Sequence, residues 1–544
     1  MNRLYYGDNL SVLREHIPDE SVDLIYLDPP FNSNRSYNVL FREADGASAD
    51  SQITAFDDTW SWGQTAEETL REIETTADPH IVQMIQAIVG FVGRNDMTAY
   101  LVMMTVRLIE LHRVLKPTGS IYLHCDPTAS HYLKVVMDTI FGKENYRNEI
   151  IWKRQSAHSD AKTKFADVAD VLLFYVGSPK ASFQPQYGEY DPDYVAKFYR
   201  FDDDDGRGPY RLDNMASPNP RPNMMYEWKG YAYPAKGWRY EKATMARLDS
   251  EGRIYYPKTK DGQPNLSRRL ALKRYLNEQQ GTIVTNIWTD IQSLHSSTAE
   301  RLGYPTQKPL ALLERIIQAS SNVGDLVLDP FCGCGTTVCA AQKLGRRWIG
   351  IDVTHLAIGL MRSRLRGLFG DEVESEYEVI GLPADVASAR ALAQHDRFEF
   401  EHWALGLIGA RSANQRKRGA DQGVDGLLYF VDEARAKAKK VVVQVKSGGV
   451  QARDIRDFRA VAARDEAVMG FFITLDAPTG PMEREALQAG YYRSPGWNRD
   501  YPMIQIRTVD QLLAGHDFDC PPANVTLSQA ERSQRNPGSQ ARLL

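Results

Sequence analysis

The segment from residue 325 to residue 352 constrains the fold of this chain more than any other. It opens with an apolar strand that ends in Asp329 and runs into a glycine turn, after which a helix is expected from about Thr336. The turn contains Gly333 and Gly335, which let the backbone approach a ligand closely. Strand, glycine turn and helix in this order are typical of a parallel sheet flanked by helices.

The next strand ends in an acid at the spacing that nucleoside-binding sheets use. Residues 348–351 form an apolar strand, and Asp352 lies about 20 positions after the glycine turn, where a carboxylate can bind ribose hydroxyls. A glycine-rich turn alone is weak support, because Gly-x-Gly often arises by accident. The acid at this distance favours a nucleoside-cofactor site over a purely structural turn.

A second turn has the chemistry to bind an amino group. The apolar run 22–27 leads into Asp28-Pro29-Pro30-Phe31, where two prolines fix φ twice and remove two backbone donors. The Asp28 carboxylate and the Pro29 carbonyl can each accept a hydrogen from an exocyclic NH2 and stabilise the charge that develops during methyl transfer. Phe31 offers a face on which an extruded base can stack. The alternative is an ordinary Pro-Pro turn after a core strand.

Together the two turns resemble those of the DNA amino-methyltransferases that use S-adenosylmethionine, in the β-class order with Asp-Pro-Pro-Phe first. The resemblance covers residues 1 to about 370 and is strongest to the modification subunits of type III systems and their solitary relatives. Further matching segments are Gly7-Asp8-Asn9, Phe56-Asp57-Asp58-Thr59-Trp60, Leu115-Lys116-Pro117-Thr118-Gly119-Ser120 and Tyr304-Pro305-Thr306-Gln307-Lys308-Pro309.

This resemblance implies the roles of individual residues. The target base would lie against Asp28, Pro29, Pro30 and Phe31. The cofactor contacts would be Asp8, Thr306, Lys308, Asp329, Phe331, Gly333, Gly335 and Asp352. Asp at position 28, where the cytosine-N4 enzymes more often carry Ser, favours adenine N6 as the acceptor. Cytosine N4 and RNA stay open as alternatives.

The pattern of strands and helices predicts a Rossmann-like, doubly wound α/β sheet. Helices are expected over 100–115 and 309–320, the second directly before the cofactor strand. Ligands bind outside the carboxyl ends of such strands, so Asp28 and Asp329 can face one cleft if their strands are adjacent. The expected methyltransferase parts are 1–150, with the target-base motif, and 286–385, which binds the cofactor.

Residues 151–285, inserted between these parts, are expected to form the target-recognition domain. The net charge of -5 does not exclude a DNA enzyme, because affinity depends on where the basic groups face. Basic residues are dense in 251–280, and aromatic and basic residues alternate in 226–242, a mixture suited to phosphates and base edges. Alternatively, the basic residues form a solvated face and the aromatic rings pack beneath it. Because the sequence does not distinguish the two, we assign base contacts to the region and to no single residue.

A different pattern begins after about residue 385. Asp425 precedes one strand, and a charged turn leads to a second strand that carries Gln444 and Lys446 on one face. The arrangement resembles the PD-(D/E)XK nuclease fold, closest to its Mrr-like branch, over roughly residues 395–510. The expected domain, α/β and restriction-endonuclease-like, spans 386–525.

The nuclease resemblance implies a magnesium site and a role for each residue. Asp425 and the Gln444 amide oxygen would ligate Mg2+, and Lys446 would orient the attacking water or offset phosphate charge. A Mg2+ site commonly has more than one carboxylate ligand, and Glu399 or Glu401 of the preceding helix could supply the second. The alternative is a charged hairpin in a module that binds DNA or a partner without cutting.

Several whole-chain features complete the prediction. Five cysteines lack zinc-ligand spacing, and a redox role for Cys332 and Cys334 is disfavoured because such a turn needs small side chains. No signal peptide, transmembrane stretch or phosphate-binding P-loop is found, so the cytoplasm is expected, and ATP-driven restriction would need a separate subunit. Residues 526–544 are expected to form a disordered tail.

The sequence therefore predicts a DNA adenine-N6 methyltransferase of a restriction-modification system, with a nuclease domain in the same chain. Its partners would be double-stranded DNA and either a second copy of itself or a separate restriction or translocase subunit, with no membrane involved. The alternative is a solitary DNA methyltransferase, acting on adenine N6 or cytosine N4, whose C-terminal domain only binds DNA or a partner.

Overall fold

The computed structural model describes residues 1–30, 35–39, 53–58, 61–155, 163, 165–294, 298, 300, 302, 306–383, 385–413, 423–430, 432 and 438–521. Phe31, the motif residues 59–60 and 304–305, and the predicted tail 526–544 lie outside the described residues. The chain divides into two compact units, of which Pro185–Thr285 is one and Met1–Gln184 with Asn286–Leu544 is the other.

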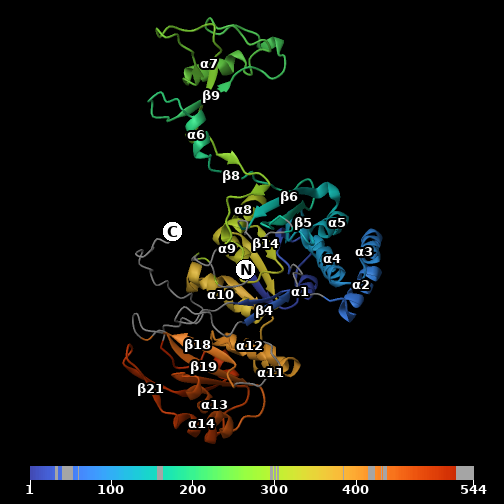
Figure 1. Cartoon of the computed structure of the whole chain (residues 1–544), viewed down its shortest axis with the longest axis vertical. Helices are drawn as coiled ribbons and strands as arrows, with labels where there is room; N and C mark the ends of the chain where they lie inside the picture. The colour runs from blue at the N-terminus through green and yellow to red at the C-terminus, as the bar shows by residue number, and fades with distance from the viewer. Residues whose placement is uncertain are drawn as a thin grey trace. The chain divides into compact units, whose positions relative to one another are not determined.

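A mixed sheet forms the centre of the larger unit (Figure 1). Within the described residues it has nine strands, in the order β13-β6-β7-β5-β2-β14-β15-β1-β16. These strands are β1 (Asn2–Tyr6), β2 (Val22–Leu27), β5 (Leu115–Cys125), β6 (Tyr146–Lys153), β7 (Ala169–Val176), β13 (Ile287–Trp288), β14 (Leu326–Asp329), β15 (Arg347–Asp352) and β16 (Tyr377–Ile380). Neighbouring strands are parallel except where β7 pairs with β5 and β6. The predicted doubly wound α/β sheet is confirmed.

Helices cover both faces of this sheet, which explains why its central strands are apolar on both sides. Alternate strand residues such as Ile25 and Leu27 pack in one core with α1 (Asn9–His16), α2 (Gln64–Thr76), α3 (Pro79–Val92), α4 (Asp96–Val114) and α5 (Ser130–Phe141). The intervening residues Leu24 and Tyr26 are buried as well. Three further helices are α8 (Leu310–Ser320), α9 (Thr336–Lys343) and α10 (His355–Phe369).

The second unit is small and has a core of its own. Its elements are β8 (Tyr187–Gly188), α6 (Pro192–Phe198), β9 (Tyr210–Asn214), α7 (Lys242–Ser250), β10 (Ile254–Tyr255), β11 (Ala271–Tyr275) and β12 (Thr282–Ile283). Met215, Trp238 and Leu272 are among the residues of the core. The unit begins at Pro185 rather than at the expected 151, because β6 and β7 pair within the main sheet.

The C-terminal part of the larger unit carries a second sheet, with the order β17-β18-β19-β20-β23. Its elements are β17 (Arg411–Ser412), β18 (Gly426–Phe430), β19 (Lys439–Lys446), β20 (Met469–Thr474) and β23 (Ile504–Thr508), with α11 (Val386–His395), α12 (Arg397–Leu407), α13 (Ala452–Arg464) and α14 (Gly480–Leu487). The predicted hairpin is β18–β19, antiparallel in pairing, and β19 then pairs in parallel with β20. Across the described ranges, no helix combines the length and the apolar character needed to span a membrane.

Candidate functional site

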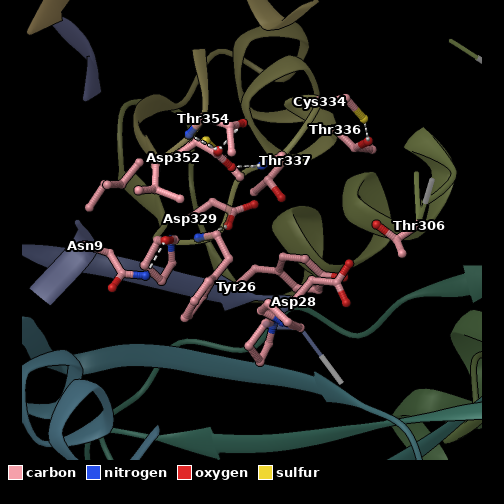
Figure 2. A pocket seen from close by; sticks show the side chains of 18 of the residues that line it. Asn9, Tyr26, Asp28, Thr306, Asp329, Cys334, Thr336, Thr337, Asp352 and Thr354 are labelled. Atoms are coloured by element: carbon pink, nitrogen blue, oxygen red, sulfur yellow. Dashed lines mark hydrogen bonds between the residues drawn. The ribbon is translucent and has the colours of Figure 1, made fainter. Parts of the chain in front are cut away.

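A cavity of about 320 Å³ lies where β1, β2, β14 and β15 end (Figure 2). β2 and β14 are adjacent parallel strands, with Leu328 beside Ile25, so Asp28 and Asp329 reach the same edge of the sheet. The predicted site residues that line the cavity are Asp8, Asp28, Pro29, Pro30, Thr306, Lys308, Asp329, Phe331, Gly333 and Asp352. Gly335 is outside the lining, and Phe31 lies outside the described residues.

The glycine turn has the backbone conformation that favours glycine. Gly333 and Gly335 have φ values of 49° and 76°. A Cβ at position 335 would lie 2.4 Å from Met361 Cγ, so this glycine allows α9 and α10 to pack closely. The Gly333 N–H donates to Asp352 Oδ2 at 2.9 Å, which fixes the turn against the acid at the end of β15.

Two carboxyl groups, the buried Asp329 and the half-buried Asp352, give the cavity its electrostatic character. Burial raises the pKa of Asp329 to about 7, although its Oδ1 accepts a hydrogen bond of 3.0 Å from the Phe331 N–H. Burial also raises the pKa of Asp352. A bound cation would stabilise the ionised form of both groups. The cavity is therefore suited to a ligand that carries positive charge.

The two oxygens of the Asp28 carboxylate lie in different environments. Its Oδ2 lies 2.5 Å from the Lys308 ammonium, in a pair whose side chains are mostly buried. Its Oδ1 is buried and has no hydrogen-bond partner among the described residues. A buried acceptor without a partner costs roughly 1–3 kcal/mol. A ligand N–H at Oδ1 would remove that cost.

The segment that carries Lys308 has an unusual backbone. Thr306, which also lines the cavity, has a φ of 63°, a left-handed conformation that is costly for a β-branched residue. The Lys308 carbonyl accepts a hydrogen bond of 3.2 Å from Thr336 Oγ at the start of α9. The strained turn and this bond hold the ammonium against Asp28.

The structure adds Arg107 to the cavity, a residue that the sequence reasoning missed. Its guanidinium lies 2.7 Å from Asp8 Oδ2 and donates to the Asn9 side chain at 2.6 Å. Asn9 in turn donates to the Pro330 carbonyl at 2.8 Å. Asp8 also caps α1, accepting from the Leu10 N–H at 3.0 Å, so this acid has a structural role as well. The available signal was an arginine in the middle of the mostly apolar helix α4.

In the second unit, the aromatic residues between 226 and 240 mostly form the core. Trp238 is 1% exposed and Tyr231 is 3% exposed, whereas Tyr233 is 47% exposed. Trp238 and Tyr231 therefore pack inside the unit, which is the alternative that the sequence left open for the aromatic residues of this segment.

The basic residues of that unit fall into two groups. Some pair with acids of the same unit, as Arg253 does with Glu278 and Lys273 with Asp203. Others are exposed and have no ion pair within the described residues: Lys258, Lys260, Arg268 and Arg269.

The structure brings the three residues predicted for a nuclease site to one end of the β18–β19 hairpin. Asp425 precedes β18, and its Oδ2 accepts a hydrogen bond of 2.7 Å from the Val445 N–H, between Gln444 and Lys446. Asp425 and Gln444 are buried, and Lys446 is half-buried. In the described part of the chain, no group of three or more Asp, Glu, His or Cys side chains could hold a metal ion.

Glu399, considered above as a further metal ligand, is engaged elsewhere. Its Oε2 accepts a hydrogen bond of 3.0 Å from the Tyr6 hydroxyl at the end of β1. It also lies 3.6 Å from Nε2 of His355, whose ring stacks on that of Tyr6. This acid therefore links α12 to the first sheet.

Comparisons with known proteins divide the chain in the same way. A family model described as DNA methylase matches residues 22–359, and one described as restriction endonuclease matches residues 392–491. The type II methyltransferase M.EcaI of Enterobacter cloacae is 35% identical over 282 residues, which are 51% of this chain and 60% of that protein. The StyLTI Mod subunit of a Salmonella typhimurium type III restriction-modification enzyme is 26% identical, over 63% of this chain and 50% of the subunit.

Other similar proteins include an adenine enzyme and two solved structures. The DNA adenine methyltransferase YhdJ of Escherichia coli is 24% identical over 66% of this chain and 81% of that protein. A DNA modification methylase of Thermus thermophilus complexed with S-adenosyl-L-methionine is 18% identical, over 70% of this chain and all of that one, with a TM-score of 0.33. The cytosine-N4-specific PvuII DNA methyltransferase is 13% identical, over 67% of this chain and 86% of that one, with a TM-score of 0.35.

Proposed function

Because the chain belongs to the DNA methylase family, we propose that it transfers a methyl group from S-adenosylmethionine to the exocyclic amino group of adenine in DNA. The single observation that carries this proposal is the buried, partnerless Oδ1 of Asp28 on the cavity that also contains the glycine turn. The chain spans 60% and 50% of the lengths of the first two relatives, so the activity of the whole protein is part of the proposal.

The cavity fits the proposed cofactor through its charge and its turn. When bound, S-adenosylmethionine supplies the methyl group on a sulfonium, and it also carries an ammonium. Asp8, Asp329 and Asp352 line the cavity and would provide the complementary negative charge. Asp352 stands at the position where a carboxylate binds ribose hydroxyls, and Gly333 lets the backbone approach.

The Asp-Pro-Pro turn would act on the target amino group. Asp28 Oδ1 and the Pro29 carbonyl accept its two hydrogens, which weakens conjugation of the nitrogen lone pair with the ring. The nitrogen lone pair would then be available to accept the methyl group that S-adenosylmethionine supplies. The positive charge that develops on nitrogen is stabilised by the carboxylate until a proton leaves to solvent.

The choice of adenine N6 rests on the residue at position 28 and on one relative. Asp in place of Ser favours adenine, and YhdJ is a DNA adenine methyltransferase. Incubating the purified chain with labelled cofactor and unmethylated duplex DNA, followed by nucleoside mass spectrometry, tests this choice. We expect N6-methyladenine, whereas N4-methylcytosine would refute the assignment of the base.

Double-stranded DNA is the proposed substrate, and the second unit is the proposed recognition domain. Its exposed and unpaired basic residues can reach phosphates, because no acid in the described residues neutralises them. Tyr233 is the side chain we assign to base contacts in this region, since the neighbouring aromatic rings are packed inside.

The C-terminal domain belongs to the restriction endonuclease family over residues 392–491, and we propose that it cuts DNA. Asp425 and Gln444 offer two oxygen ligands, and Mg2+ commonly completes its shell with water and phosphate oxygens. Lys446 would orient the attacking water or offset charge on the phosphate. Methylation by the first domain would then protect the host's own sites.

We propose that the protein acts in a restriction-modification system in the cytoplasm. Two relatives are Mod subunits of type III restriction-modification enzymes. By analogy we propose that this chain works as a homodimer or with a separate translocating subunit. If purified chain never cut unmethylated DNA in Mg2+, the solitary methyltransferase with a binding module would be the better description.

A further inference from the structure

A buried arginine contacts both the methylase cavity and the segment that leads to Lys308. Arg364 belongs to α10, and its side chain is 4% exposed. Its Nη1 donates to Thr336 Oγ at 2.8 Å and to the Cys334 carbonyl at 3.4 Å, and both of these residues line the cavity (Figure 2). Its Nη2 donates to Glu300 Oε1 at 3.2 Å. The methyl transfer proposed above gives this arginine no role.

The permanent charge of the guanidinium fixes the direction of these hydrogen bonds. An arginine only donates, so the Thr336 oxygen accepts from Arg364. The single hydroxyl hydrogen of Thr336 can then point to the Lys308 carbonyl, which lies 3.2 Å from Oγ. Cys334 Sγ, 4.0 Å from the same oxygen, is a much weaker acceptor. Arg364 therefore holds the backbone of Lys308 through one hydroxyl group.

The contact of Arg364 with Glu300 holds the same segment on both sides of Lys308. Glu300 Oε1 also accepts a hydrogen bond of 2.7 Å from the Leu310 N–H, at the start of α8. The Glu300 carbonyl accepts a hydrogen bond of 2.8 Å from the Gln307 side chain. Residues before and after Lys308 are therefore bound to Glu300, and Glu300 is bound to the guanidinium.

The backbone that is held in this way is strained, and it places a charge. Thr306 has a φ of 63°, which a β-branched residue keeps only where its surroundings impose it. The Lys308 ammonium, two residues later, lies 2.5 Å from Asp28 Oδ2. A buried ion pair such as Arg364 with Glu300 adds little stability compared with apolar side chains of the same size. Fixing the geometry of this segment therefore explains the pair better than support of the fold does.

We propose that Arg364 is a positioning residue, which holds the backbone of Thr306 and Lys308 so that the ammonium stays on Asp28 Oδ2 and Oδ1 is left to the target amino group. This inference rests on the proposed function. Arg364 acts through Thr336 and is not among the described residues that line the cavity. A reacting group displaced by about 1 Å can lower a rate by roughly 100-fold, so an indirect anchor of this kind has a measurable effect.

Arg364→Lys separates the positioning role from the mere presence of a buried cation. Lysine keeps a charge beside Glu300, but its single nitrogen cannot reproduce the two-sided contact of the guanidinium with Glu300 and Thr336. Arg362→Gln is the matched control, because Arg362 lies on the same helix, is 43% exposed and pairs with Glu374.

The first experiment is a double-mutant cycle on the full chain with Arg364→Lys, Lys308→Met and both together. Single-turnover methylation rates would be measured on unmethylated duplex DNA at saturating S-adenosylmethionine. We expect losses of roughly 30-fold for Arg364→Lys, roughly 100-fold for Lys308→Met and no further loss in the double variant. Arg362→Gln should match the wild type. Losses that multiply, or an Arg364→Lys defect that disappears at saturating cofactor, would overturn the proposal.

Hydrogen exchange followed by mass spectrometry tests the same anchor without cofactor or turnover. In Arg364→Lys, the amides of residues 306–312 should exchange faster than in the wild type, while those of β14 should keep their protection. Arg362→Gln should leave both regions unchanged. Faster exchange throughout the methylase part would show support of the fold, and unchanged exchange at 306–312 would show no anchor. Either result would refute the proposal.

Thr336→Val covers the case in which Arg364→Lys does not fold. It removes only the hydroxyl group between Arg364 and the Lys308 carbonyl, so we expect a roughly tenfold lower methylation rate. Thr336→Ser keeps the hydroxyl and should restore most of that loss, and a Thr336→Val rate equal to that of the wild type would overturn the proposal. If the wild type transfers no methyl group, the proposed function fails, and hydrogen exchange alone then decides whether Arg364 anchors the segment.

Discussion

The Lys308 ammonium lies 2.5 Å from Oδ2 of Asp28, which stands 280 positions earlier in the chain. Oδ1 of Asp28 is therefore the oxygen that is available to a ligand. The pair joins the turn after β2 to the segment before α8. Because both side chains are mostly buried, neither charge is well solvated by water, and each depends on the other.

Removing the Lys308 charge should disable Asp28. Lys308→Met leaves the mostly buried Asp28 carboxylate without the cation that holds its Oδ2, so Oδ1 should be less well placed to accept from the target amino group. We expect a loss of at least about 100-fold in the single-turnover methylation rate. Lys343→Met is the matched control, since Lys343 forms a surface pair with Glu314 and is 53% exposed. Equal rates for the two variants would contradict the role of Lys308.

The pKa of Asp329 predicts how cofactor binding depends on pH. A carboxyl whose pKa is raised to about 7 is protonated in the free protein at pH 6 and ionised at pH 8. A cationic cofactor prefers the ionised form, so its affinity should fall as pH drops below about 7, at most about tenfold per unit. Calorimetry at pH 6, 7 and 8 measures this. Equal affinities at pH 6 and pH 8 would contradict the prediction.

The same pKa has a consequence for stability without ligand. The pKa of Asp329 is raised above its unfolded value of 3.8, so the protonated carboxyl favours the folded state. This contribution to the free energy of unfolding is fully present below pH 3.8 and is lost as the pH rises through 7. Asp329→Asn should therefore melt at a higher temperature than wild type at pH 8, with a smaller difference at pH 5. It should also bind the cofactor more weakly at pH 8.

Lys446→Ala should abolish DNA cleavage and leave methylation intact. Lys446 is the last residue of β19 and directly follows Val445, whose N–H donates to Asp425, far along the sequence from the methylase cavity. We expect at least a 100-fold loss of cleavage of unmethylated DNA in Mg2+. Lys439→Ala, at the opposite end of the same strand, serves as the control. Cleavage that survives Lys446→Ala would remove this residue from the nuclease site.

The unpaired basic residues of the second unit should dominate DNA affinity. Replacing Lys258 and Lys260 with Ala removes two exposed charges that no acid in the described residues offsets. We expect roughly tenfold weaker binding of duplex DNA and a salt dependence reduced by about two units of slope. Arg247→Ala is the control, because Arg247 already pairs with Glu251 on the surface. The prediction fails if the control weakens binding equally.

Local patterns in the sequence were sufficient where a motif fixes its own backbone. The strand, glycine turn and acid ending at Asp352 form as predicted, and so does the hairpin that carries Gln444. Each of these is determined by neighbours within a few tens of residues. The membership of the chain in the methylase family and the α/β fold are confirmed, whereas the roles of individual site residues stay predictions.

Contacts between distant segments could not be read in the same way. Arg107 pairs with Asp8 across the fold, and a single arginine in a helix does not indicate its partner. The strands β6 and β7 join the main sheet rather than the inserted domain, because an apolar strand does not specify the sheet in which it pairs. Aromatic residues such as Trp238 suit a core and a DNA surface equally, and only packing distinguishes the two.

The central claim is that Asp28 presents the target amino group of adenine for methylation. Single-molecule sequencing with nucleoside mass spectrometry of DNA from a methylation-free host, expressing wild type or Asp28→Ala, tests it most directly. We predict N6-methyladenine at one sequence motif with the wild type and none with the variant. Methylation that persists in Asp28→Ala, or soluble wild-type protein that leaves no methylated base in the DNA, would contradict it.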